Sequence, residues 1–180
     1  AGHEIASHTR SHADMSLISD PVQLQFQVDG SRLDLLQSIG VPISTFAYPY
    51  GVAGALDNLK AAGYSGARSV TSDELNKKTT NRYNLFALEV DAGVSLASVK
   101  ASIDQAIANG QWLVLVFHKV ENNCPDEYCT TTTNFSGIVS YLKSKGSAVD
   151  VITLGQGLGQ MNNNPVSDGV APIITQNDLI

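Results

Sequence analysis

Residues 112–118 read Trp-Leu-Val-Leu-Val-Phe-His, and they contain the longest apolar run in the chain. A short continuous run of this kind predicts a β-strand that is buried on both faces. Such strands occur in parallel sheets covered by helices, so the run favours an α/β fold. The strand delivers His118 at its carboxyl end, where α/β folds place functional residues. A histidine in this place can also cap the strand end through a backbone hydrogen bond, and both interpretations stay open.

Strand-like and helix-like segments alternate on both sides of this run. Strands are expected at 3–8, 43–48, 64–70, 85–90, 112–117 and 149–154, and helices at 21–39, 53–62, 95–110 and 135–145. The first helix is indicated by apolar residues at nearly helical spacing, namely Val22, Phe26, Leu33, Leu36 and Ile39. This alternation predicts a parallel sheet or barrel covered by helices. We expect one domain over 1–161 and a polar tail or linker over 162–180, which is rich in Asn, Pro, Gly and Asp.

Composition and charge restrict the class of partner. The chain has 180 residues, 11 Lys plus Arg and 17 Asp plus Glu, for a net charge of −6. This balance argues against a nucleic-acid partner and against a polybasic membrane anchor. The longest apolar run is far shorter than the ~20 residues that a bilayer span needs, so no membrane span is expected.

Cys124 and Cys129 are the 2 cysteines of the chain, and both lie in a polar segment that contains Asn and Pro. A local disulfide is the favoured interpretation, and it predicts a secreted or extracytoplasmic protein. Two reduced thiols are the alternative. A zinc site built from this pair alone is disfavoured, because structural zinc normally takes four ligands.

The segment His8-Thr9-Arg10-Ser11-His12 places two imidazoles four residues apart, directly after an expected strand. On a helical turn this spacing puts both rings on one face, close enough to share one cation. The alternative is a pair of surface histidines in a turn rich in Ser and Thr.

The segment Phe46-Ala47-Tyr48-Pro49-Tyr50-Gly51 predicts a strand that runs into a tight turn. Glycine at position 51 permits a backbone conformation that other residues resist. Such a turn can aim a backbone N–H into a cleft, as an oxyanion hole requires. An ordinary aromatic turn is the alternative.

Together these three elements resemble the polysaccharide deacetylases, carbohydrate esterase family 4. Residues 2–12 are similar to the family's strand followed by its His-Ser/Thr-x-x-His metal motif. Residues 46–51 look like a variant of its Arg-x-Pro-Tyr element, and 115–118 look like its late strand that bears the catalytic histidine. The order and spacing agree from Ala1 to about Met161.

The resemblance implies a role for each matched residue. His8 and His12 would ligate a divalent metal, usually zinc, which polarises the carbonyl and activates a water. The backbone N–H of Tyr50 would stabilise the oxyanion. His118 would protonate the leaving group as general acid, and Asp91 would pair with His118.

The expected substrate-binding residues are Tyr48, Pro49, Arg68 and Val116. Val116 would help line the pocket for the acetyl methyl group. Arg68 would replace a family arginine whose usual position holds Ala47, although it could equally be a surface cation.

One departure from the family concerns its Thr-Phe-Asp-Asp motif, which supplies the general base and a third metal ligand. The sequence lacks this motif, and neither Glu4, Asp14 nor Asp20 has its place on a neighbouring strand. We therefore expect an irregular (β/α) barrel without its first two βα units, whose missing segment would precede Ala1.

Three functions agree with these observations. The leading one is a secreted, metal-dependent hydrolase that removes N- or O-acetyl groups from an acetylated polysaccharide or oligosaccharide. The second is a non-catalytic carbohydrate-binding descendant of the same fold, in which Tyr48, Tyr50 and Trp112 contact sugar rings. The third is a hydrolase of small amides on the same scaffold.

Overall fold

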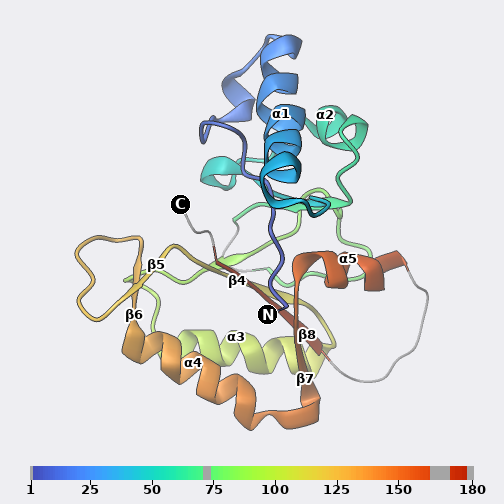
Figure 1. Cartoon of the computed structure of the whole chain (residues 1–180). Coiled ribbons are helices and arrows are strands. Elements are labelled where there is room, and N and C mark those ends of the chain that lie inside the picture. The colour runs from blue at the N-terminus through green and yellow to red at the C-terminus, as the bar shows by residue number, and fades with distance from the viewer. Residues whose placement is uncertain (1, 71–73, 163–170, 178–180) are drawn as a thin grey trace. The chain divides into compact units, whose positions relative to one another are not determined.

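The computed structural model describes residues 2–70, 74–162 and 171–177 (Figure 1). The chain divides into two compact units. The N-terminal unit contains Ala1–Thr71 and Thr80–Phe86, and the C-terminal unit contains Ser72–Thr79 and Ala87–Ile180. Helices and parallel strand pairs occur in both units, so the predicted α/β class is confirmed.

The N-terminal unit is built on the parallel pair β1 (Thr45–Ala47) and β2 (Gly66–Arg68). Single parallel bridges add Ser7 beside Phe46 and Leu85 beside Arg68. The expected strand 3–8 is thus reduced to its bridging residue Ser7, which bonds with the backbones on either side of Phe46. The unit also contains the short helices η1 (Met15–Leu17), η2 (Pro49–Gly51) and α2 (Leu56–Ala61). Its core consists of Met15, Val28, Ile43, Phe46, Tyr48, Leu59, Tyr64 and Ala67.

Helix α1 (Pro21–Ile39) has the bounds that the sequence predicts. The Asp20 side chain caps its first turn by accepting from Val22 N, and Gly40 ends it with φ 75°. The buried residues of the helix, however, are Gln27, Val28 and Ser31. The apolar residues whose spacing predicts the helix are exposed, namely Val22, Phe26, Leu33, Leu36 and Ile39.

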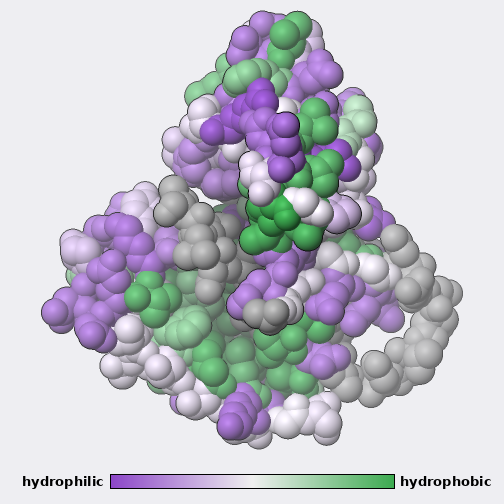
Figure 2. Space-filling model, viewed as in Figure 1, coloured by the Kyte–Doolittle hydropathy of each residue, from purple (hydrophilic) through white to green (hydrophobic). Residues whose placement is uncertain are grey.

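In the upper part of Figure 2, where Figure 1 places α1, apolar and polar residues are mixed on the surface. Leu24, Val28 and Leu35 are the α1 residues that pack on the core of the unit. The helix therefore turns a half-polar face inward, because Gln27 and Ser31 find hydrogen-bond partners there.

The C-terminal unit contains a parallel sheet in the order β3-β4-β8-β7. Its strands are β3 (Leu88–Glu89), β4 (Leu113–Phe117), β8 (Ala171–Asn177) and β7 (Val149–Ile152). Every residue of β4 is buried, as the apolar run predicts. A second parallel pair is formed by β5 (Lys119–Glu121) and β6 (Cys129–Thr131).

Helices α3 (Leu96–Asn109) and α4 (Thr132–Ser144) lie side by side against this sheet (Figure 1). Ser95 caps α3 through its side chain, and Gly110 ends it with φ 59°, as the sequence predicts. The short helix η3 (Gly146–Ala148) leads into β7, and α5 (Leu154–Asn162) follows that strand. Among the residues that the structure describes, no helix combines the length and the apolar character needed to cross a membrane.

The segment expected to be a polar tail contains β8, which pairs with β4 on one side and β7 on the other. The register places Ile173 beside Leu113 and Val151. The run Ala-Pro-Ile-Ile-Thr at 171–175 has the β-branched residues of a strand, and the polar residues on either side of it conceal this signal. Residues 163–170 and 178–180 of the expected tail lie outside the described residues.

Candidate functional site

The two histidines of the first motif lie together in the N-terminal unit. The His8 and His12 ring centroids are 4.8 Å apart, with an interplanar angle of 69°. His8 Nδ1 lies 2.8 Å from the Ala47 carbonyl oxygen. Because a carbonyl only accepts, Nδ1 carries the proton and Nε2 carries the lone pair of the neutral ring. This tautomer suits a metal ligand whose other nitrogen is held by a backbone carbonyl.

The backbone that joins the two histidines is not a helical turn, the conformation on which the spacing argument depends. Thr9 has φ 66° and His12 has φ 55°, both in the left-handed region. The Thr9 hydroxyl accepts a hydrogen bond of 3.1 Å from Ala13 N, which closes the bend. A bent loop, rather than one helix face, therefore brings the rings together.

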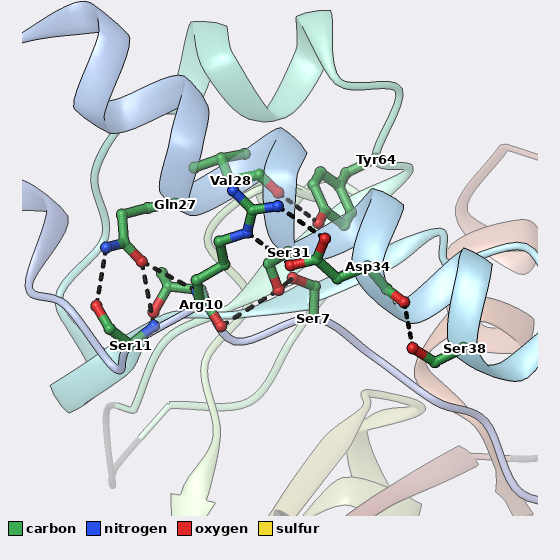
Figure 3. A network of polar contacts seen from close by, with 10 residues as sticks. Ser7, Arg10, Ser11, Gln27, Val28, Ser31, Asp34, Ser38 and Tyr64 are labelled. Carbon is green, nitrogen blue, oxygen red and sulfur yellow. Dashed lines mark hydrogen bonds and ion pairs between the residues drawn. The ribbon is translucent and has the colours of Figure 1, made fainter.

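This loop is attached to α1 by a network of polar contacts (Figure 3). Arg10 forms a bidentate ion pair with Asp34, with N–O distances of 2.6 and 2.7 Å. The hydrogen bond to Arg10 lowers the pKa of Asp34, and the same contact raises the pKa of Arg10. The Arg10 guanidinium also lies 4.2 Å from the centre of the Phe26 ring.

The donors present fit a divalent metal in type but are incomplete in number. Two imidazole nitrogens at neighbouring positions are typical zinc ligands, and a catalytic zinc usually has three protein ligands. Across the described ranges, no group of 3 or more His, Cys, Asp and Glu side chains could hold a metal. The acidic residues close to the motif in sequence already have hydrogen-bond partners. Asp14 caps η1 and Asp20 caps α1, and Glu4 accepts a hydrogen bond from the Thr45 hydroxyl.

The turn after β1 places a third ring beside the pair. The Tyr50 and His12 ring centroids are 4.6 Å apart, and Tyr50 is 67% exposed. Tyr50 has φ 56° and ψ 11°, and Gly51 has φ 67°. A Cβ at Gly51 would lie 2.8 Å from Val70 N, so glycine is required here. Among the hydrogen bonds of the described residues, none uses the Tyr50 N–H.

All four expected substrate-binding residues are buried. Tyr48 is 1% exposed and donates from its hydroxyl to the Tyr83 carbonyl oxygen at 2.7 Å. Pro49 is also buried. Arg68 in β2 is 2% exposed, so the alternative of a surface cation is wrong, and Val116 in β4 is inaccessible. These side chains support the strands and the turn.

His118 belongs to the C-terminal unit, where it pairs with a carboxylate that sequence reasoning missed. Its Nδ1 lies 3.1 Å from Glu89 Oε1, and the two side chains are 25% and 27% exposed. The expected partner Asp91 instead accepts from Gly93 N at 2.8 Å. The reason is that the chain turns directly after β3, where Val94 N also bonds to Asp91 O. Parallel pairing of Glu89 with Val116 brings Glu89 to the end of β4.

The cysteine loop supplies a further residue that the sequence analysis did not identify. Cys124 and Cys129 form a disulfide. This loop carries Tyr128, whose ring centroid is 5.7 Å from that of His118 and whose side chain is 52% exposed. Lys119 N donates to Tyr128 O, which fixes the backbone of the loop beside β5. The position of Tyr128 next to a cysteine is the available sequence signal.

An apolar cavity of about 380 Å³ lies in the C-terminal unit. It is lined by Phe117, Phe135, Ile138, Val139, Leu142, Lys143, Gly146, Val149 and Val151. In this part of the structure, none of the sequence-predicted site residues lines the cavity. Its lining lacks an acid–base pair, so we place the candidate chemistry at the histidines.

Comparison with known proteins supports the resemblance over the first two motifs, 2–12 and 46–51. Residues 1–67 match the family model of the polysaccharide deacetylases, so this region is similar to a polysaccharide deacetylase domain. The chain is 32% identical over 120 residues to a gellan lyase from a Bacillus species. That alignment covers 66% of this chain but 5% of the gellan lyase. No solved structure matches.

Proposed function

We propose that this chain is part of a metal-dependent hydrolase that removes acetyl groups from an acetylated polysaccharide. The proposal rests on one observation, which is that the rings of His8, His12 and Tyr50 form a cluster. His8 and His12 lie in the region that matches the deacetylase family, and Tyr50 lies there too. The match supports a carbohydrate-active enzyme, and the cluster supports acyl transfer as its chemistry.

His8 and His12 would hold the divalent metal, zinc being the expected ion. When bound, the metal supplies a Lewis acid for the carbonyl and lowers the pKa of a bound water. A third ligand would come from outside the described residues. The Tyr50 N–H would donate to the oxygen that becomes negative, because no hydrogen bond among the described residues occupies that N–H.

His118 is proposed as the proton donor to the leaving group. With Nδ1–H donating to Glu89, the ring is held in one orientation and Nε2 exchanges the proton. Glu89 thus takes the role that the sequence analysis gave to Asp91. Tyr128 beside His118 offers an exposed aromatic face of the kind that sugars contact.

We further propose that the native protein is secreted or extracytoplasmic and forms an irregular (β/α) barrel. The Cys124–Cys129 disulfide supports the first point. The parallel pairing in both units supports the second. Acetylated chitin oligomers, peptidoglycan, xylan and gellan are the substrates to compare, the last because of the gellan lyase similarity.

Acetate release from this panel in the presence of Zn²⁺ tests the proposal. We expect release from at least one substrate, and loss of release after chelation. His118→Ala should lower turnover by about 10²-fold or more, the size of general acid catalysis, while metal content is retained. Acetate release that survives chelation would contradict metal dependence. Loss of metal in His118→Ala would show that this residue is a ligand.

A carbohydrate-binding descendant without catalysis is the second candidate. It is favoured by the lack of a third ligand among the described residues, together with the exposed Tyr50 and Tyr128 side chains. Tyr48 and Trp112 cannot contact sugars in this structure, because they are 1% and 3% exposed. Oligosaccharide binding without acetate release would favour this candidate.

A further inference from the structure

The inward face of α1 carries two polar side chains that are directed at the histidine loop. Gln27 is 8% exposed and Ser31 is 5% exposed. A buried amide in a helix is costly unless its polar atoms are paired. Here both ends of the Gln27 amide bond to the segment between His8 and His12.

The Gln27 side chain forms hydrogen bonds to the backbone of this segment. Its Oε1 accepts from Arg10 N at 3.0 Å and from Ser11 N at 3.2 Å, and its Nε2 donates to Ser11 Oγ at 2.8 Å (Figure 3). The two N–H groups belong to successive residues of the loop. One side chain therefore satisfies two backbone donors that no strand or helix pairs.

Ser31, one turn further along α1, bonds to the start of the same loop. Its hydroxyl donates to the Thr9 carbonyl oxygen at 3.2 Å and lies 2.8 Å from Ser7 Oγ. On the next turn, Asp34 holds the Arg10 side chain. Gly30 leaves room for that side chain, since a Cβ there would lie 2.6 Å from the guanidinium carbon.

We propose that Gln27 is a positioning residue that holds the His8–His12 loop in the conformation required for metal binding. This inference rests on the proposed function. Thr9 and His12 keep left-handed backbones, which persist only where the surroundings enforce them. Without the Gln27 oxygen, two backbone N–H groups lose their acceptor, the loop relaxes, and His12 leaves its place beside His8.

Zn²⁺ titration of the purified chain by calorimetry tests this role with matched variants. Gln27→Met keeps the size of the side chain but removes all three hydrogen bonds, and we expect about tenfold weaker Zn²⁺ binding or more. Gln27→Glu keeps an acceptor for both N–H groups, and the Ser11 hydroxyl can donate to it, so affinity should return to near the wild-type value. Gln25→Met, at an exposed position of the same helix, should change nothing.

Circular dichroism of each variant at the titration temperature shows whether weaker Zn²⁺ binding comes from unfolding of the protein or from displacement of the histidine loop. Wild-type affinity in a folded Gln27→Met would overturn the inference, and so would a Gln27→Glu protein as weak as Gln27→Met. If Gln27→Met does not fold, Gln27→Ala removes the same three hydrogen bonds with a smaller side chain, and unchanged Zn²⁺ affinity in that variant, once folded, would overturn it. Absence of Zn²⁺ binding by the wild-type chain would instead overturn the proposed metal site, and the inference with it.

Discussion

Two buried tyrosines should make the N-terminal unit sensitive to alkali. Burial raises the pKa of both Tyr48 and Tyr64 to about 12, from an ordinary value of 10.0, and the neighbouring Tyr83 adds to the shift at Tyr48. A folded state that holds these protons more tightly than the unfolded chain loses stability as the pH rises. The loss begins near pH 10, where the unfolded tyrosines ionise, and is complete near pH 12.

The size of the effect follows from the shift of each tyrosine. One pKa unit corresponds to ~1.4 kcal/mol, so each tyrosine should remove about 1.4 kcal/mol of the free energy of unfolding at pH 11 relative to pH 8. Tyr64→Phe also removes the 3.0 Å hydrogen bond to Val28 O. That variant should be less stable than the wild type by about 1 kcal/mol at pH 8, and about equally stable at pH 11.

Urea unfolding followed by circular dichroism at pH 8 and pH 11 measures this difference. Absorbance of ionised tyrosine near 295 nm gives an independent measurement, because Tyr64→Phe should remove one late-titrating group. Tyr141→Phe is the control, since its hydroxyl bonds to the exposed Asp104 carboxylate in the C-terminal unit. Equal pH dependence in wild type and Tyr64→Phe would refute the argument from burial.

Three further predictions concern the site. His12→Ala should abolish metal retention on dialysis, measured by plasma mass spectrometry, because one imidazole does not hold the ion; unchanged retention would show that the ligand assignment is wrong. Glu89→Gln should lower acetate release by about tenfold to a hundredfold, less than the ~10²- to 10⁴-fold of general acid catalysis because His118 itself is retained, whereas Asp91→Asn should not; the reverse order would restore the sequence-based pairing. Replacing Cys124 and Cys129 with serine should lower the free energy of unfolding by about 2 kcal/mol in urea melts; an unchanged midpoint would show that the disulfide adds no stability.

Local signals predicted much of the fold correctly. The bounds of α1 and α3 follow from their caps at Asp20, Ser95 and Gly110, which act within one turn of the chain. The burial of β4 follows from its continuous apolar run. These features depend on neighbouring residues, so one sequence contains the information.

Features that depend on contacts between residues far apart in the sequence could not be predicted from local patterns. The inward face of α1 is set by hydrogen bonds of Gln27 and Ser31 to a loop 16 to 22 residues away. The choice of Glu89 over Asp91 depends on where the chain turns after β3. The strand β8 becomes recognisable through its pairing with β4 and β7.

In the candidate site, too, some features follow from the local sequence and others depend on distant contacts. The motif spacing predicted that His8 and His12 lie close together, and their rings are 4.8 Å apart. That prediction used the geometry of a helical turn, but Thr9 and His12 have left-handed backbones instead. The type of residue and its approximate position were therefore predictable, but the backbone that holds it was not.

A titration of the wild-type chain with Zn²⁺, observed through the ring-nitrogen NMR signals of its histidines, tests the central claim most directly. We predict that ring-nitrogen signals of both His8 and His12 shift together at one stoichiometric equivalent, while those of His3 do not. Signals of His8 and His12 that stay unchanged, or that move only in parallel with His3, would contradict the claim that these two rings bind a metal.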